Sequence, residues 1–202
     1  MPTVYLIDAM AFVNKYQKQG AKTFGELHNG YMDKIFQLKP SGCSCINIIG
    51  DRYDFEDNLS LKTYGRQRRT DGAMSKEYHL SASLEIPEWK QFIRHPKNKA
   101  NLLEFIASSF YNDICNLPNE MMIILGGFSK DKGEALKITS VSSSVLDLKC
   151  EDHEEEDTRL IAHLAYCVEH LGHRRAVVYA NDIDIIILCM YHFCRIQKLN
   201  EL

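Results

Sequence analysis

Four short apolar runs constrain the fold of this chain more than any other feature. Each has the length of a buried strand and lacks the alternation of polar and apolar residues that marks a strand with one solvent-exposed face. The runs are Val4–Ile7, Cys45–Gly50, Met121–Leu125 and Ala176–Ala180. Helical patterns separate them. This alternation predicts an α/β fold, a three-layer αβα sandwich with a mostly parallel central sheet and right-handed crossovers.

The helical patterns carry recognisable start and stop signals. Thr23–Glu26 has the form of a capping box, and apolar residues then recur at helical spacing as far as Leu38. A second helix begins at Lys97, and a third opens at 154–157 and ends before Gly172, a suitable C-terminal cap. The sequence thus predicts one helix between each pair of successive apolar runs.

Two segments have a less regular pattern. Tyr78–Pro87 alternates in part and could form a hairpin, and Ser140–Ser144 reads as a loop or the entry to a short strand. We expect a single domain over residues 1–202, with an irregular basic insertion at about 52–96.

The composition is that of an ordinary globular protein, with 45% hydrophobic and 25% charged residues. A net charge of −3 argues against a protein that coats DNA. It is compatible with a nucleic-acid enzyme in which the positive charge of a basic strip offsets the negative charge of an acidic metal site. No secretory leader and no apolar stretch of ~20 residues is present, so we expect an intracellular protein, nuclear or cytoplasmic, with no membrane partner. We interpret the seven cysteines as free thiols, mostly buried.

Acidic residues follow three of the apolar runs. Asp8 ends the first, Asp51 the second, and Asp182 and Asp184 follow the fourth. Because the carboxyl ends of parallel strands meet at one edge of a sheet, these side chains should converge there. Glu155 and Asp157, in the first turn of the third helix, can reach the same edge.

Each acid alone has an explanation as a turn residue or a helix cap. Together they would repel one another unless a cation neutralised them, and oxygen donors of this kind suit Mg²⁺ or Mn²⁺. Two such ions ~4 Å apart can hydrolyse a phosphodiester without a serine or cysteine nucleophile. No phosphate-binding loop, G-x-S-x-G elbow or H-E-x-x-H motif competes with this interpretation.

A basic cluster follows Asp51 closely. Lys62, Arg66, Arg68 and Arg69 are candidates for binding the phosphates of a nucleic acid, and a solvated charged segment is the alternative. Trp89 lies beside a second, weaker basic strip and is more typical of core packing than of base stacking.

The motifs together resemble the PIN-like superfamily, and within it the flap-endonuclease-like 5′-nucleases. The matching segments are Leu6–Met10, Ile48–Asp51, Ser60–Arg69, Glu155–Asp157 and Asn181–Asp184. The resemblance implies a PIN-like nuclease domain in which the acids of these segments bind metal. Glu155–Arg159 with Asp182–Ile186 is also similar to uncharacterised animal proteins linked to mobile elements.

The chain departs from the 5′-nucleases in two places. No helix-hairpin-helix element for duplex DNA is visible, and residues 70–96 replace the usual arch. The resemblance therefore implies a divalent-metal-dependent nuclease acting on single-stranded or branched DNA, or on RNA. The alternatives are a catalytically silent PIN-like module that binds nucleic acid or protein and, third, a Rossmann-like enzyme, although Asp8–Ala11 lacks the glycine-rich turn.

Overall fold

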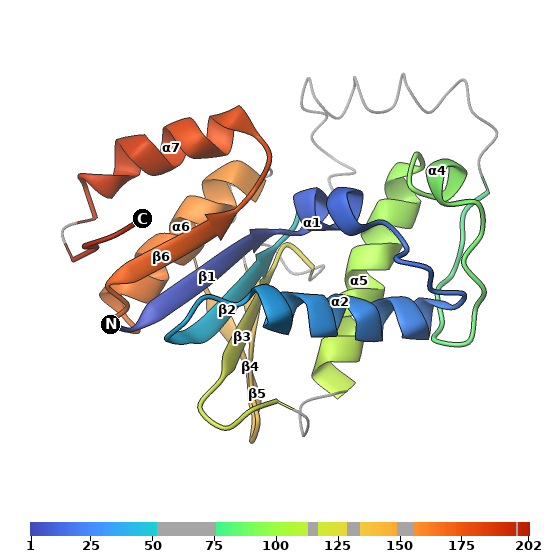
Figure 1. Ribbon diagram of the computed structural model, residues 1–202, viewed down its shortest axis with the longest axis horizontal. Helices are drawn as coiled ribbons and strands as arrows, with labels where there is room; N and C mark the ends of the chain where they lie inside the picture. The colour runs from blue at the N-terminus through green and yellow to red at the C-terminus, as the bar shows by residue number, and fades with distance from the viewer. Residues whose placement is uncertain (52–75, 113–116, 129–133, 149–155, 197) are drawn as a thin grey trace.

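The computed structural model describes residues 1–51, 76–112, 117–128, 134–148, 156–196 and 198–202. Its centre is a six-stranded sheet with the order β5-β4-β3-β2-β1-β6 (Figure 1). The strands are β1 (Thr3–Asp8), β2 (Cys43–Ile49), β3 (Met122–Gly126), β4 (Glu134–Thr139), β5 (Ser143–Asp147) and β6 (Arg175–Tyr179). The helices are α1 (Ala9–Tyr16), α2 (Phe24–Leu38), α4 (Trp89–Phe92), α5 (Pro96–Asn112), α6 (Glu156–Glu169) and α7 (Ile183–Phe193).

The four apolar runs form the parallel part of the sheet, as predicted. β1 pairs in parallel with both β2 and β6, and β2 pairs in parallel with β3. The prediction of an α/β fold with a mostly parallel sheet is therefore confirmed. β1 and β2 are buried along nearly their whole length, which explains why their sequences lack polar alternation.

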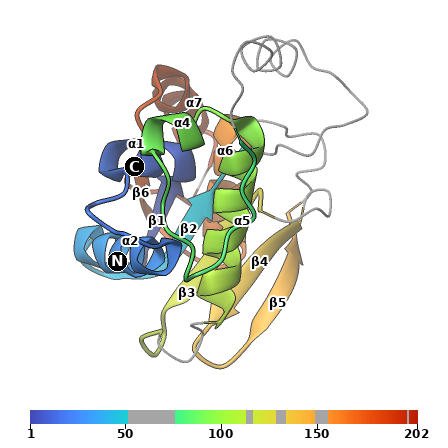
Figure 2. The same cartoon turned by 90° about the vertical axis from the view of Figure 1, so that its right-hand side faces the viewer.

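β4 and β5 extend the sheet with antiparallel pairing, which the sequence did not reveal (Figure 2). They form a hairpin whose turn lies at 140–142. Ser143 and Ser144 belong to β5, so the serine-rich stretch is partly strand. The sequence does not predict this hairpin because its strands contain polar and charged residues. The solvent-exposed edge of β5 tolerates such residues.

Helices cover both faces of the sheet, because successive side chains of a strand point to opposite faces. Tyr5 and Ile7 of β1 pack with buried residues of α1, α2, α4 and α5. Val4 and Leu6 pack with buried residues of α6 and α7 on the other face. The arrangement has three layers, with the sheet between two groups of helices (Figure 1).

The segment Tyr78–Pro87 is not a hairpin, so that expectation is wrong. It runs beside the start of α2, where Leu84 and Ala82 accept hydrogen bonds from the backbone of Phe24 and Gly25. Within the described part of the chain, its β pairing is a single bridge between Thr23 and Glu85. The segment satisfies donors at a helix N-terminus, which would otherwise lack partners.

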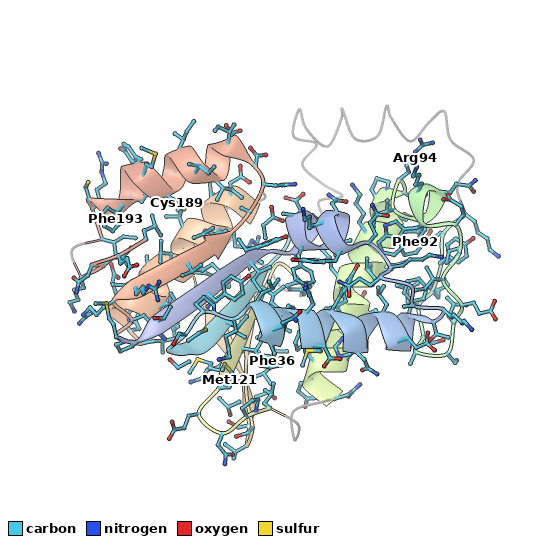
Figure 3. All side chains as sticks on the ribbon, viewed as in Figure 1. Phe36, Phe92, Arg94, Met121, Cys189 and Phe193 are labelled. Carbon is cyan, nitrogen blue, oxygen red and sulfur yellow. The ribbon has the colours of Figure 1, made fainter. Side chains whose placement is uncertain are left out.

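The remaining expectations concern single residues. Trp89 is buried on α4 beside Phe92, labelled in Figure 3, so the prediction of core packing is confirmed. The described cysteines are free thiols, and all but Cys194 are buried. Among the described residues, no helix is long and apolar enough to cross a membrane.

Candidate functional site

Three neighbouring strands bring predicted acids to one edge of the sheet. Asp8 is the last residue of β1 and lies in register with Ile49, the last residue of β2. Asp51 follows β2 after a single glycine, and β6, on the other side of β1, leads into Asp182. Neighbouring strands lie about 4.8 Å apart. The parallel order β2-β1-β6 therefore directs all three acids to the carboxyl edge, which we call the acidic edge.

α6 begins at the same edge. β5 is parallel to β3, because two antiparallel pairings separate them, so α6 connects two strands of like direction. The helix of such a crossover runs against the strands, and its first turn lies near their carboxyl ends. α6 packs on β1 and β2, and Asp157 lies in its first turn. Glu155 lies outside the described residues.

Asp8 is the most buried of the predicted acids, with only 2% of its surface exposed. Its Oδ1 accepts a hydrogen bond of 2.7 Å from the backbone N–H of Ala11 and so caps the N-terminus of α1. A carboxylate is rarely buried unless hydrogen bonds or cations compensate its charge. The cap holds this side chain at the acidic edge.

Asp182 and Asp184 are exposed at the start of α7. The Oδ1 of Asp182 accepts a hydrogen bond of 2.9 Å from the backbone N–H of Asp184, which makes Asp182 the N-cap of the helix. Capping thus accounts for the position of both Asp8 and Asp182. A carboxylate has about four acceptor sites, so a capping carboxylate can also bind a second group.

The described acids do not form a closed set of metal ligands. Within the described part of the chain, no three His, Cys, Asp or Glu side chains come together as a group that could hold a metal ion. The predicted basic residues Lys62, Arg66, Arg68 and Arg69 lie outside the described residues. A cavity of about 570 Å³ lies between α5 and β3–β5, and none of the predicted acids is among its described lining residues.

A tyrosine cluster beside Asp8 was not predicted from the sequence. The rings of Tyr16 and Tyr179 are stacked with their centroids 6.4 Å apart. Burial, helped by Tyr16, Tyr5 and the charge of Asp8, raises the pKa of Tyr179 to about 12. Its phenol therefore stays protonated at neutral pH and remains a hydrogen-bond donor next to the acidic edge.

Two buried polar residues of α6 were also missed. Arg159 is 1% exposed although it lies only two residues after Asp157, and His163 lies one turn further along the helix. The Nδ1 of His163 is 2.8 Å from Oδ1 of Asn47 on β2, and because an amide oxygen only accepts, Nδ1 carries the proton. A polar pair four residues apart is typical of a solvent-facing helix, so the sequence carries no signal for this burial.

The environment keeps His163 neutral. Burial, together with the charge of Arg159, lowers the pKa of His163 from 6.5 to about 3. The unfolded chain takes up a proton below pH 6.5, while the folded chain does not, so this contribution to stability is present above pH 6.5 and is lost as the pH falls toward 3.

We expect His163→Gln to remove this pH dependence. Glutamine keeps an N–H donor for Asn47 but does not titrate. The difference in unfolding free energy between wild type and variant should shrink by about 3 kcal/mol between pH 7 and pH 4, at about 1.4 kcal/mol per pKa unit. Urea titrations at several pH values measure this difference in unfolding free energy. His79→Gln, at an exposed histidine, is the matched control for the change of side chain and should leave the unfolding free energy at pH 7 close to that of wild type.

Protein-family models, curated proteins and solved structures were compared with the chain, and none of them matches it.

Proposed function

We propose that this chain is a divalent-metal-dependent nuclease with a PIN-like domain, which hydrolyses phosphodiester bonds of DNA or RNA at the acidic edge. The observation that supports the proposal is the strand order β2-β1-β6, which directs Asp8, Asp51 and Asp182 to one edge. Asp157 reaches this edge from the start of α6. Four separate segments thus carry acids toward the same edge of the sheet.

The donor chemistry fits Mg²⁺ or Mn²⁺, because all the described candidate ligands are carboxylates and these ions prefer oxygen. Asp8, Asp51, Asp157, Asp182 and Asp184 would hold the metal, with Glu155 as a further candidate. When bound, such ions activate a water and stabilise the charge on the leaving oxygen of a phosphodiester. The buried, capped Asp8 would fix the position of the site on the sheet.

The protonated phenol of Tyr179 is suited to donate a hydrogen bond to a phosphate oxygen of the substrate. We propose that the basic cluster Lys62, Arg66, Arg68 and Arg69 binds the nucleic-acid backbone, as cations of this kind do in other nucleic-acid proteins. Within this proposal, the carboxylates bind metal while the basic residues and the phenol bind the substrate. The substrates are single-stranded or branched DNA, or RNA.

Metal dependence is the direct test. We expect the purified chain to cleave end-labelled single-stranded or flapped DNA, or RNA, when Mn²⁺ or Mg²⁺ is added, and to stop when a chelator is in excess. Ca²⁺ is the matched control, since it binds oxygen ligands with a looser geometry and usually supports catalysis poorly. Absence of metal-dependent cleavage on every one of these substrates would contradict the proposal.

A second candidate is a catalytically silent PIN-like module that binds nucleic acid or a protein. The caps made by Asp8 and Asp182 favour it, because they give both acids a role that needs no metal. This candidate predicts binding without turnover. Binding to labelled nucleic acid that weakens steeply with salt, and that never leads to cleavage, would support it over the nuclease.

A further inference from the structure

α7 carries an apolar stripe on its outer side. Its large side chains are more than half exposed: Ile183 by 64%, Ile186 by 51%, Ile187 by 57%, Met190 by 70% and Tyr191 by 54%. They recur three and four residues apart, so they lie on one face of the helix. We call these five residues the α7 stripe.

The opposite side of α7 is already packed. Ile185 and Cys189 are buried against residues of α6, and Figure 1 shows α7 on the outside of α6 (Cys189 is labelled in Figure 3). α7 is thus apolar on both its inner and its outer side. Such a helix is typically covered on all sides, and a contiguous exposed apolar patch marks an interaction surface.

The two ends of the α7 stripe have opposite charge. Asp182 and Asp184 lie at the start of the helix, and Arg195 and Lys198 follow its end, all four exposed. The guanidinium of Arg195 lies 3.5 Å from the centroid of the Tyr191 ring and donates a hydrogen bond of 2.7 Å to the Tyr191 carbonyl. The positive charge is therefore held at the end of the stripe, about 12 Å from Ile183 along the helix axis.

We propose that the α7 stripe binds the α7 stripe of a second copy of this chain, with the two helices antiparallel about a two-fold axis. This arrangement places the acidic end of each helix over the basic end of the other, and it opposes the two helix dipoles. With the axis between Leu188 and Cys189, Ile187 faces the second copy's Met190. Ile186 then faces the second copy's Tyr191, and Ile183 faces its Cys194.

Charge favours this occupant over others. A parallel pair would place acids against acids and cations against cations. A nucleic acid would meet an uncharged face along the stripe, where phosphate binding requires cations. An anionic lipid surface would be repelled at the acidic end, whereas helices that lie on membranes usually carry Lys and Arg along the polar face.

The mass in solution tests the pairing. By light scattering, the chain should have twice its 23.3 kDa mass at about 100 μM and dissociate on dilution. Ile187→Glu with Met190→Glu should give a monomer, because two pairs of carboxylates would then face each other across the axis. Val141→Glu with Val145→Glu, which changes two other exposed apolar residues by the same charge, is the control and should remain dimeric.

Disulfide formation tests the orientation. With Ile183→Cys, the new thiol should meet the second copy's Cys194, and a mild thiol oxidant such as diamide should give a covalent dimer. Adding Cys194→Ser should abolish that dimer. Wild type should not crosslink through Cys194, because an antiparallel pair separates the two Cys194 residues.

Three results would overturn the proposal. One is a monomer at every concentration up to about 100 μM. Another is a dimer that persists in the Ile187→Glu, Met190→Glu variant while circular dichroism shows it folded. A third is a Cys194–Cys194 crosslink in wild type, which would indicate parallel helices. None of these readouts depends on nuclease activity, so the pairing and the proposed function can fail separately.

Discussion

Replacing Asp8 with Asn is expected to lower the rate of metal-dependent cleavage by about 100-fold or more while the chain stays folded. Metal ions contribute several kcal/mol to a phosphodiester transition state, and each 1.4 kcal/mol corresponds to a factor of ten in rate. Asn removes a charged ligand but is as good an N-cap as Asp, so α1 keeps its start. Single-turnover cleavage and a thermal melt measure the two effects.

The Asp8→Asn experiment has a matched control in Asp33→Asn. Asp33 is exposed on α2, away from the acidic edge, and its replacement removes the same charge. This variant should cleave like wild type. If Asp8→Asn and the double variant Asp8→Asn, Asp182→Asn both retain wild-type cleavage, the acidic edge is not the active site. If only the melting temperature falls, the charge of Asp8 contributes to stability and not to cleavage.

Gly127→Ala is expected to destabilise the fold by about 3 kcal/mol or more, near the upper end for overpacking. Gly127 has φ +86°, and a Cβ placed there would lie 2.1 Å from the carbonyl oxygen of Gly50. The backbone N–H of Gly50 also donates a hydrogen bond of 2.9 Å to the carbonyl of Gly126. Because the clash is with backbone, no side chain can rotate away. The following residue, Asp51, should be displaced with Gly50.

Gly172→Ala separates the clash from the cost of the backbone angle. Gly172 has φ +76°, and nothing lies within 4 Å of its added Cβ. The Gly172→Ala substitution should lower the free energy of unfolding by about 1 kcal/mol, the usual penalty of a left-handed conformation for a residue other than glycine. Urea unfolding of both variants gives the comparison. Equal losses would show that β2 and β3 can move apart at Gly50 without cost.

The sequence predicted the elements whose burial leaves a pattern. Val4–Ile7 is apolar because β1 lies between two strands and two helix layers, so the burial of its side chains could be inferred from the sequence. The hairpin of β4 and β5 could not be predicted from the sequence, because Glu134–Thr139 mixes charged with apolar residues. A strand near an edge is stabilised by its neighbour rather than by its own composition.

In the candidate site, too, only part of the arrangement could be predicted from the sequence. Parallel pairing allowed the convergence of strand ends at one edge to be predicted, because it depends on backbone topology alone. The direction in which each carboxylate points could not be predicted, since the local caps of α1 and α7 orient Asp8 and Asp182. The burial of His163 depends on its tertiary contact with Asn47 of β2, and a polar residue on a helix gives no sign of such a contact.

The position of β6 has a consequence for the order of assembly. β6 is the last of the described strands along the chain, yet it pairs with β1, the first of them. During synthesis, β1 can pair with β2 early, but its other edge stays open until residues 175–179 leave the ribosome. Pairings between such distant segments form slowly, and open edges invite association with other chains. The acidic edge, which needs both Asp8 and Asp182, is therefore complete only after residues 175–182 have been made.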